Sequence, residues 1–342
     1  MMKKIYTFLF IIFSALSLKL SAQDHHFSQF FNAPIYLNPS LTGQFDGDLR
    51  LNMIYRNQWT GLNGDLSYLN ASADVYVPKL AGGLGLSFNK SSEGTTFLNK
   101  NNIAATYAYS VGGDDFTASF GLQVGFTNRT IDWSKLVFAD QIDRRLGYVP
   151  GSASAAIPLD ISNQFYFDPA AGANFVYRNA MFGAALYHIN QPNESFTGVE
   201  AKLPMRLTIN ASFKMPLNYG VHYSDTDGAF LIPSVVYHKQ GNIGSLSAGA
   251  QFKYKGFNSG LWYRTNQAGE RDAIVFSLIF DVFLKRNDSE KIRVGLSHDA
   301  TVSSINYGNT GGSTEASFGY EKYWLNSNRT KQYNGLRCSN FY

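Results

Sequence analysis

The chain has 342 residues and a formal net charge of +4, a balance that argues against a nucleic-acid partner because no basic run accompanies it. Its only cysteine, Cys338, excludes an internal disulfide. Aromatic residues make up 15% of the sequence, with 31 Gly, 21 Tyr and 27 Phe, which is a composition typical of membrane β-barrels with aromatic girdles.

Residues 1–22 have the layout of a secretory signal peptide. Lys3 and Lys4 precede an apolar run at 5–18, and small residues follow at Ser21 and Ala22, after which we expect cleavage. The alternative, a membrane anchor, is disfavoured because the apolar run is shorter than the roughly 18 residues that a spanning helix needs. Without the three lysines of this segment, 26 basic residues face 25 acidic ones in the exported chain.

Residues 23–47 form an N-terminal arm that follows neither a strand nor a helix period. Its aromatic side chains are too apolar to remain free in water, and Asn38-Pro39 favours a turn. Two interpretations stay open. The arm either packs on the domain or forms a partial plug inside the mouth of a barrel.

The rest of the chain repeats one pattern, which is clearest at 116–126 (FTASFGLQVGF). Every second side chain is apolar, and the side chains between them are small or polar, so a β-strand would carry the two kinds on opposite faces. The segment is long for a soluble strand and close to the roughly 9–11 residues that cross a bilayer when tilted. We therefore expect the apolar row to face lipid and the polar row to face a lumen.

About fourteen segments carry this pattern, an even number as in single-chain bacterial barrels. They are 48–56, 67–77, 82–89, 102–111, 116–127, 170–178, 180–189, 205–214, 230–238, 245–254, 257–264, 273–283, 291–299 and 314–323. Tight turns such as 112–114 and 255–256 alternate with longer connections, of which 128–169 is the longest. The sequence predicts an all-β protein, a transmembrane antiparallel β-barrel at 48–324, with the arm packed in or under the barrel mouth and a C-terminal periplasmic tail at 325–342.

Basic side chains fall on the lumen face of these strands, since each would cost roughly 2–4 kcal/mol at mid-depth on the lipid face. Salt bridges with carboxylates such as Asp74 are favoured over a transport path for this set, which comprises Arg50, Arg56, Arg178, Arg206, Lys214, Lys253 and Arg264. Large amphipathic rings near strand ends are expected at the bilayer boundary: Tyr55, Trp59, Tyr107, Tyr109, Trp262, Tyr320, Tyr323 and Trp324. The apolar segment 131–138 predicts an ordered outer loop that acts as a lid, a constriction or a docking surface.

Several short motifs resemble the PorP/SprF family of outer-membrane barrels of the bacterial type IX secretion system. They are His26-Phe27-Ser28-Gln29-Phe30 with Asn32-Ala33-Pro34, Tyr36-Leu37-Asn38-Pro39 with Leu41-Thr42-Gly43, Tyr55-Arg56-Asn57-Gln58-Trp59, Asp140-Gln141-Ile142-Asp143 and Arg337-Cys338. The resemblance implies a channel-less or plugged barrel in the outer membrane. It also implies that the barrel helps the export or surface attachment of partner proteins with C-terminal targeting domains, such as gliding adhesins, together with periplasmic, peptidoglycan-linked subunits.

No catalytic, cofactor-binding or metal-binding residues are predicted. His25 and His26 lack acidic or thiol ligands at metal-site spacing, and Ser297 and His298 would point to opposite faces of one strand. The candidate plug or partner-binding residues are His26, Phe27, Phe30, Tyr36, Asn38, Pro39, Arg56, Trp59, Trp133 and Asp140. We therefore expect a non-enzymatic docking or assembly subunit, and the alternative is a passive or hydrophobic-solute transporter that uses the arm as a hatch.

Overall fold

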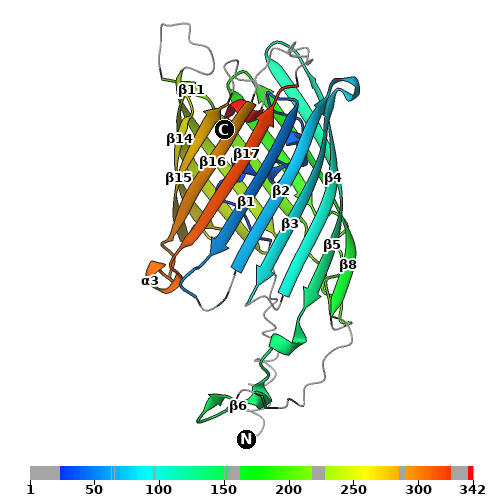
Figure 1. Cartoon of the computed structure of the whole chain (residues 1–342), viewed down its shortest axis with the longest axis vertical. Coiled ribbons are helices and arrows are strands. Elements are labelled where there is room, and N and C mark those ends of the chain that lie inside the picture. Colours follow the sequence, from blue (N-terminus) through cyan, green and yellow to red (C-terminus); the bar gives the residue numbers. More distant parts are fainter. Residues whose placement is uncertain are drawn as a thin grey trace, which may run out of the picture.

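The computed structural model describes residues 24–62, 64, 66–94, 98–149, 151–152, 154, 162–196, 198–217, 228–284, 290–324 and 338–341. Fourteen long antiparallel strands close into a barrel, which confirms the predicted fold class (Figure 1). They are β1 (Leu49–Gln58), β2 (Leu66–Val77), β3 (Gly82–Glu93), β4 (Leu98–Gly112), β5 (Phe116–Ile131), β8 (Asn163–Tyr177), β9 (Ala180–Tyr187), β10 (Arg206–Phe213), β12 (Ala229–Gln240), β13 (Ile243–Tyr254), β14 (Phe257–Asn266), β15 (Arg271–Phe283), β16 (Glu290–Thr301) and β17 (Ser313–Lys322).

Two pairings decide that the sheet is closed. The first and last strands, β1 and β17, pair from Leu49↔Lys322 to Gln58↔Ser313. Strand β10 pairs with β12, which joins the strands before residue 214 to the strands after residue 228. The two-residue β11 (Met215–Pro216) also pairs with β12 and extends this contact. A closed ring leaves no unpaired strand edge, which is the condition for a sheet to reside in lipid. No helix among the described residues is long and apolar enough to cross a membrane.

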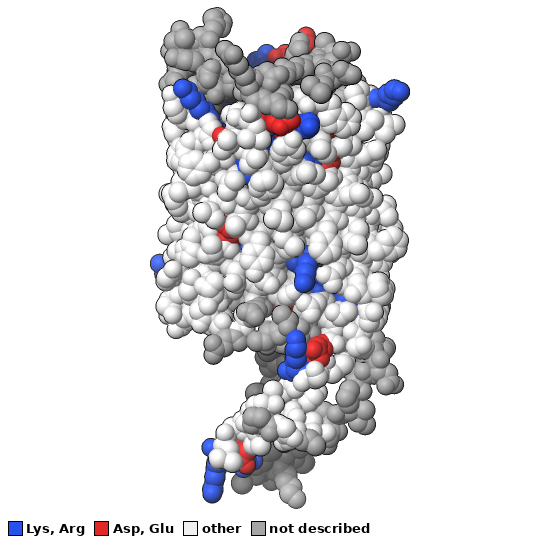
Figure 2. All heavy atoms as spheres, in the orientation of Figure 1, with Lys and Arg blue, Asp and Glu red and all other residues white. Residues whose placement is uncertain are grey.

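The strands separate an apolar outer face from a polar inner face. On β5, Phe120, Leu122 and Phe126 point outward and are 55%, 66% and 63% exposed, whereas Ser119 and Thr127 point inward and are buried. Figure 2 shows an outer surface with few charged side chains between the two ends of the barrel. The outer face therefore meets lipid, and the inner face lines the lumen.

The two ends of the barrel differ in their connections. Tight turns cluster at the upper end in Figure 1, including η3 (Pro78–Leu80) and the turns at Arg178–Asn179 and Lys255–Gly256. The opposite end carries α3 (Tyr307–Thr310) and the long connection with η4 (Trp133–Lys135), η5 (Ala139–Gln141), β6 (Ile142–Asp143) and β7 (Gly147–Tyr148). Because outer-membrane barrels have short periplasmic turns and long extracellular loops, we name these the periplasmic end and the outer end.

Three details differ from the sequence-based expectations. The longest connection is 132–162 rather than 128–169, because β5 and β8 continue to pair beyond the apolar belt, as far as Thr130↔Asn163. Trp262 is not at the bilayer boundary but faces the lumen and is 3% exposed. Arg178 does not face the lumen but lies in a tight turn. Its exposed side chain pairs with Asp115 of the neighbouring turn.

The core of the molecule lies inside the barrel and is formed by the N-terminal arm. The arm contains η1 (Phe30–Asn32), α2 (Pro34–Leu37) and η2 (Pro39–Leu41), and it runs from Asp24 at the outer end to Gly47 at the periplasmic end. The C-terminal η6 (Cys338–Phe341) lies at the periplasmic end, with Phe341 fully buried in one cluster with Phe31, Leu41 and Trp262. Segments from both ends of the chain thus fill the lumen.

Candidate functional site: the arm inside the barrel

The arm satisfies its own backbone through short turns and through the barrel wall. Pro34 and Pro39 each open a short helix, where proline's missing N–H costs nothing. Asn38 caps η2 by accepting a hydrogen bond from the Ser40 backbone N–H at 3.0 Å. Its amide group also donates to the backbone carbonyls of Ala173 and Ala184 at 3.0 and 3.2 Å. An irregular chain can therefore stay buried because its polar groups have partners.

Glycines on the lumen face give the arm its space. A Cβ atom placed on Gly121 would lie 2.3 Å from the Ser40 nitrogen, and one on Gly172 would lie 2.1 Å from the Asn38 side-chain oxygen. At Gly83 the same atom would lie 2.6 Å from the Cα atom of Gly43. These distances leave no room for a Cβ atom, so the wall is glycine at these three positions, where the arm backbone or the Asn38 side chain approaches it.

A buried charge cluster holds the middle of the arm. Arg56 is 2% exposed and pairs with Glu315 at 2.6 Å and with Asp299 at 2.9 Å. Glu315 in turn accepts hydrogen bonds from the backbone N–H groups of Ser28 and Gln29 at 2.7 and 2.8 Å. The Ser28 hydroxyl donates to Asp299 at 2.7 Å. The arm is thus part of the cluster, and its removal would leave Glu315 without two of its donors.

A second cluster holds the arm near the periplasmic end. Arg50 forms a two-pronged ion pair with Asp74, with distances of 3.0 and 2.8 Å, in line with the expectation that basic residues of the lumen pair with carboxylates such as Asp74. Asp74 also accepts from the backbone N–H of Gly43 at 2.7 Å, and Arg50 donates to the Leu41 carbonyl at 3.0 Å. The Arg50 guanidinium lies 4.6 Å from the centre of the Phe45 ring. One ion pair therefore fixes both the wall and the last turn of the arm.

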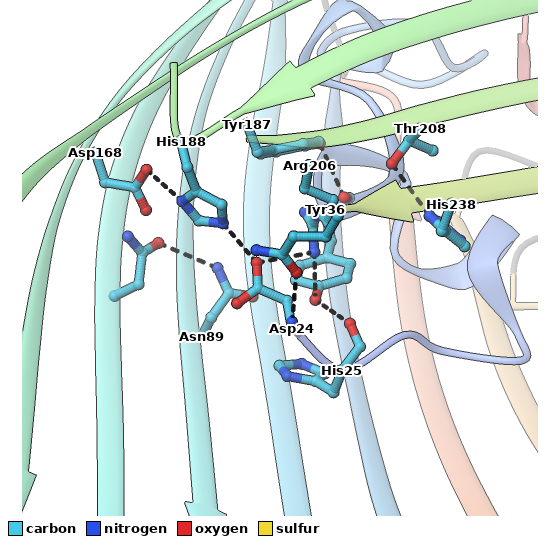
Figure 3. A network of polar contacts seen from close by, with 12 residues as sticks. Asp24, His25, Tyr36, Asn89, Asp168, Tyr187, His188, Arg206, Thr208 and His238 are labelled. Atoms are coloured by element: carbon cyan, nitrogen blue, oxygen red, sulfur yellow. Dashed lines mark hydrogen bonds and ion pairs between the residues drawn. The ribbon is translucent and has the colours of Figure 1, made fainter. Parts of the chain in front are cut away.

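A third cluster fixes the outer end of the arm (Figure 3). His188 follows β9 and lies between two carboxylates, with Nε2 2.5 Å from Asp24 and Nδ1 2.7 Å from Asp168. Burial lowers the pKa of His188, but the two carboxylates outweigh it and raise the pKa above its ordinary value. Burial raises the pKa of Asp24, yet the charges of Lys100 and His188 hold it well below the usual range. The His188 side chain therefore bridges the arm to β8.

Aromatic rings surround this outer cluster. The Tyr36 hydroxyl donates to the His25 carbonyl at 2.5 Å and accepts from Arg206 at 2.8 Å. The Arg206 guanidinium lies 4.6 and 4.1 Å from the ring centres of Tyr36 and Tyr187. The His25 ring stacks on Tyr68 at 4.2 Å, and burial lowers the pKa of His25 to about 3, so this imidazole is neutral.

The loop between β9 and β10 covers the cluster from outside. Glu194 is buried and pairs with Lys100 at 3.1 Å, while Arg129 donates to the Glu194 carbonyl at 2.8 Å. Arg129 also lies 5.1 Å from the ring centre of the buried Phe196. A cavity of about 50 Å³ beside Asp24, lined also by Lys100 and His188, has room for a few water molecules. No group of three or more potential ligands arranged for a metal ion occurs in the described part of the chain.

The structure brings together seven of the ten candidate residues from the sequence. Phe27, Phe30, Asn38 and Pro39 are buried, and His26, Tyr36 and Arg56 also lie in the lumen. The other three lie at the outer end: Trp59 in the connection after β1, and Trp133 and Asp140 in the connection between β5 and β8. The arm residues therefore contact the barrel itself, and only the latter three lie where a partner outside the cell would approach.

Sequence reasoning missed most of the residues that hold the arm. Asp168, Asp299 and Glu315 are carboxylates at inward-facing strand positions, and this parity is the signal that would have found them. Asp24 lies outside the strands, so no periodicity marks it. His188 lies in the predicted segment 180–189, but β9 ends at Tyr187 and the positive φ of His188 turns its side chain away from the face that alternation assigns to it. Ser297 and Asp299 face the lumen while His298 contacts Thr314 and Tyr307, so the spacing argument against a Ser–His pair holds.

Comparison with known proteins now adds to this geometry. The family model described as type IX secretion system membrane protein PorP/SprF matches residues 19–320, which include the arm and almost the whole barrel. The chain belongs to this family. Family membership and the closed, apolar-belted barrel place the protein in the bacterial outer membrane. No curated protein matches the chain at a significant level.

Solved barrels resemble this family member only distantly. The outer membrane protein Omp33 of Acinetobacter baumannii is 6% identical with a TM-score of 0.42, covering 83% of this chain and 100% of that one. A mutant of TodX, a monoaromatic hydrocarbon channel, is 11% identical with a TM-score of 0.45, covering 86% and 94%. A Rhodopseudomonas blastica porin mutant has a TM-score of 0.30 at 8% identity, covering 80% and 99%. These resemblances are too distant to support a statement about what this chain does.

Proposed function

We propose that this family member is a permanently plugged, non-enzymatic barrel that docks partner proteins of the type IX secretion system. Its partners would be secreted proteins with C-terminal targeting domains on the outer side and peptidoglycan-linked subunits of the machine on the periplasmic side. The barrel would anchor these proteins in the outer membrane and would not conduct them through its lumen. The observation that carries the proposal is the arm, which occupies the lumen from the outer end to the periplasmic end.

The closed lumen argues against the alternative of a solute transporter. A hatch has to move, and moving this arm would take from Glu315 the N–H donors of Ser28 and Gln29. It would also take from Asp74 the N–H donor of Gly43 and separate Asp24 from His188. Each hydrogen bond to a charged group is worth about 1.5–3 kcal/mol, and separating the Asp24–His188 pair adds about 3–5 kcal/mol. A solute that diffuses passively supplies no free energy that could offset the cost of displacing the arm. The arm therefore stays in the lumen and makes the barrel a rigid support for bound partner proteins.

The long outer connection offers the docking surface. It extends beyond the barrel rim in Figure 1 and carries large apolar side chains that nothing in the described chain covers. Leu146 is 81% exposed, Ile142 is 53% exposed and Tyr148 is 49% exposed, and all three belong to the small hairpin of β6 and β7. Exposed apolar residues that gather on one short hairpin are typical of a protein interaction site.

The test is a pull-down from detergent-solubilised outer membranes with mass spectrometry of the retained proteins. Replacing residues 139–149 with a short Gly–Ser turn should remove the secreted partner while leaving the heat-resistant migration of the barrel unchanged. Replacing the exposed turn 267–269 between β14 and β15 is the matched control and should retain the partner. Retention by the first variant would refute this docking surface. A steady ion current from the wild-type protein in planar bilayers would instead favour transport.

A further inference from the structure

Strand β8 has a free edge at the outer end of the barrel, beyond the level at which the ring is closed. Its pairing with β9 ends at Ala171↔Leu186, whereas its pairing with β5 continues as far as Asn163. Eight residues of β8, 163–170, therefore extend past β9, a length of roughly 26 Å at the usual rise of a strand. Figure 1 shows β5 and β8 reaching farther toward the outer end than β1 and β2.

The register shows which main-chain groups this edge presents. The Ile131 N–H donates to the Ser162 carbonyl at 3.0 Å, so the even-numbered residues of β8 bond to β5 in this antiparallel pair. The odd-numbered residues point their N–H and C=O groups away from β5. At Asn163 and Phe165 these groups have no hydrogen-bond partner among the described residues.

The connection after β9 covers the lower part of this edge. The Ile189 N–H donates to the Pro169 carbonyl at 3.3 Å. The Asn190 side-chain amide donates to the Phe167 carbonyl at 2.7 Å. Phe167 packs on Phe126, the last outward apolar residue of β5, with ring centres 5.6 Å apart, so these contacts lie at the rim of the lipid belt. The uncovered groups farther along β8 lie beyond that rim, where water or a partner chain can reach them.

The sequence of this edge lacks the features that keep strand edges from pairing. Natural proteins protect such edges with charged side chains, proline or a bulge. The segment 163–167 (NQFYF) has no charge and no proline, and its register with β5 is continuous. The Phe165 side chain points outward and is 70% exposed. A neutral, aromatic strand with free main-chain groups is suited to pairing with an extended polypeptide.

The two faces of the edge indicate the kind of segment that it would take. Phe165 lies on the outward face, whereas Gln164 and Tyr166 lie on the inward face, where the Tyr166 hydroxyl donates to Glu194. Side chains directly opposite each other on paired strands lie on the same face. An added strand would therefore alternate an apolar residue beside Phe165 with polar residues beside Gln164 and Tyr166. An acyl chain or a saccharide has no alternating N–H and C=O groups at this spacing, so a polypeptide fits the edge.

We propose that the free edge of β8 binds an extended segment of a secreted protein as an added strand. The inference rests on the proposed docking function and names how the secreted chain is held. The segment pairs with the main chain of Asn163 and Phe165 and places an apolar side chain beside the Phe165 ring. The edge directly follows the connection that carries β6 and β7, so one partner can contact the hairpin and the edge together.

The first experiment is photo-cross-linking of the full chain in the outer membranes of the cells that make it. Phe165→p-benzoylphenylalanine keeps an aromatic ring and adds a photoreactive ketone. Irradiation should link it to a secreted protein, and mass spectrometry should map the link to one segment in which apolar and polar residues alternate. The matched control is the same substitution at Phe120, which is 55% exposed in the lipid belt and should give no protein adduct.

The second experiment removes one main-chain donor of the edge. Asn163→Pro deletes the N–H that points away from β5, at the first residue of the strand, where proline is tolerated. It should reduce the secreted protein retained in the pull-down by about tenfold. The matched control is Asn163→Ala, which loses the same side chain and its hydrogen bond to Asn128 but keeps the N–H, and should retain the partner. Heat-resistant migration shows that each variant is folded.

Two outcomes would overturn the proposal alone. One is equal retention of the secreted protein by Asn163→Pro and Asn163→Ala. The other is an adduct at position 165 with a second copy of this chain, or with lipid only. Either result leaves the docking function standing if the replacement of 139–149 still loses the partner. If the wild-type chain retains no secreted protein, the docking function fails and the inference fails with it.

Discussion

Replacing Arg56 with leucine tests whether buried charge holds the arm in the lumen. The Arg56 side chain is 2% exposed and pairs with Glu315 and Asp299. Asp299 keeps a second partner in Arg264 at 3.0 Å, but Glu315 would lose its only cationic partner in the described chain. It would keep the arm's N–H groups at Ser28 and Gln29 and the Ser297 hydroxyl at 3.4 Å. Removing one partner of a buried ion pair costs about 3–5 kcal/mol, so Arg56→Leu should lower the unfolding free energy by that amount.

The assay is urea-induced unfolding in phospholipid vesicles, combined with ion conductance in planar bilayers. Arg56→Leu should also produce intermittent current, because the arm loses its central attachment. Adding Glu315→Gln removes the uncompensated charge, so the double variant should regain at least about 1 kcal/mol relative to additivity. Arg178→Leu, in an exposed pair, is the control and should leave stability unchanged. Strict additivity of Arg56→Leu and Glu315→Gln, or a loss for Arg56→Leu no larger than that control, would refute the reasoning.

Three further predictions concern the arm and the tail. Gly121→Ala should destabilise the barrel by about 1–3 kcal/mol and raise its conductance, whereas Gly125→Ala, whose nearest atoms are in the wall, should not open the lumen. Phe341→Ala should cost about 3–5 kcal/mol in urea unfolding, because the ring is fully buried. The raised pKa of His188 stabilises the fold below its ordinary pKa of 6.5, and this contribution is lost as the pH rises through the raised value. Hydrogen exchange of the amides at 24–29 should therefore accelerate in that range beyond the intrinsic rate, and His188→Gln should remove the effect.

The barrel could be predicted from the sequence because lipid and lumen impose opposite demands on alternate residues. All fourteen expected strands occur, and Arg50 and Asp74 face inward as direct cross-strand partners, in line with the expected salt bridges inside the lumen. The expectation that Trp262 lies at the bilayer boundary was wrong, because it relied on the residue type and ignored the alternation of inward and outward positions along the strand. Its neighbours Leu261 and Tyr263 face outward, so Trp262 had to face inward, where Phe30 and Phe31 provide an apolar surrounding.

The path of the arm could not be predicted because it has no period that assigns its side chains to a face. Its partners are also remote in the chain: Ser28 and Glu315 are separated by 287 positions. The glycines that admit the arm were visible in the sequence, but glycine in a strand also marks a bulge or a bend. The structure shows which explanation applies, because Gly121 lies close to Ser40 and Gly172 lies close to Asn38, so both glycines make room for the arm.

The buried charges and the arm depend on each other, and this dependence explains why the lumen is closed. In a water-filled barrel, Arg56, Asp74 and Glu315 would be hydrated and would need no further partner. With the arm inserted they are desolvated, and the arm's backbone N–H groups at Ser28, Gln29 and Gly43 replace the lost water. Water can replace the lost N–H donors of Glu315 and Asp74 only when the arm has left both clusters. Partial withdrawal therefore removes hydrogen bonds without rehydrating the charges, and the closed state is the stable one.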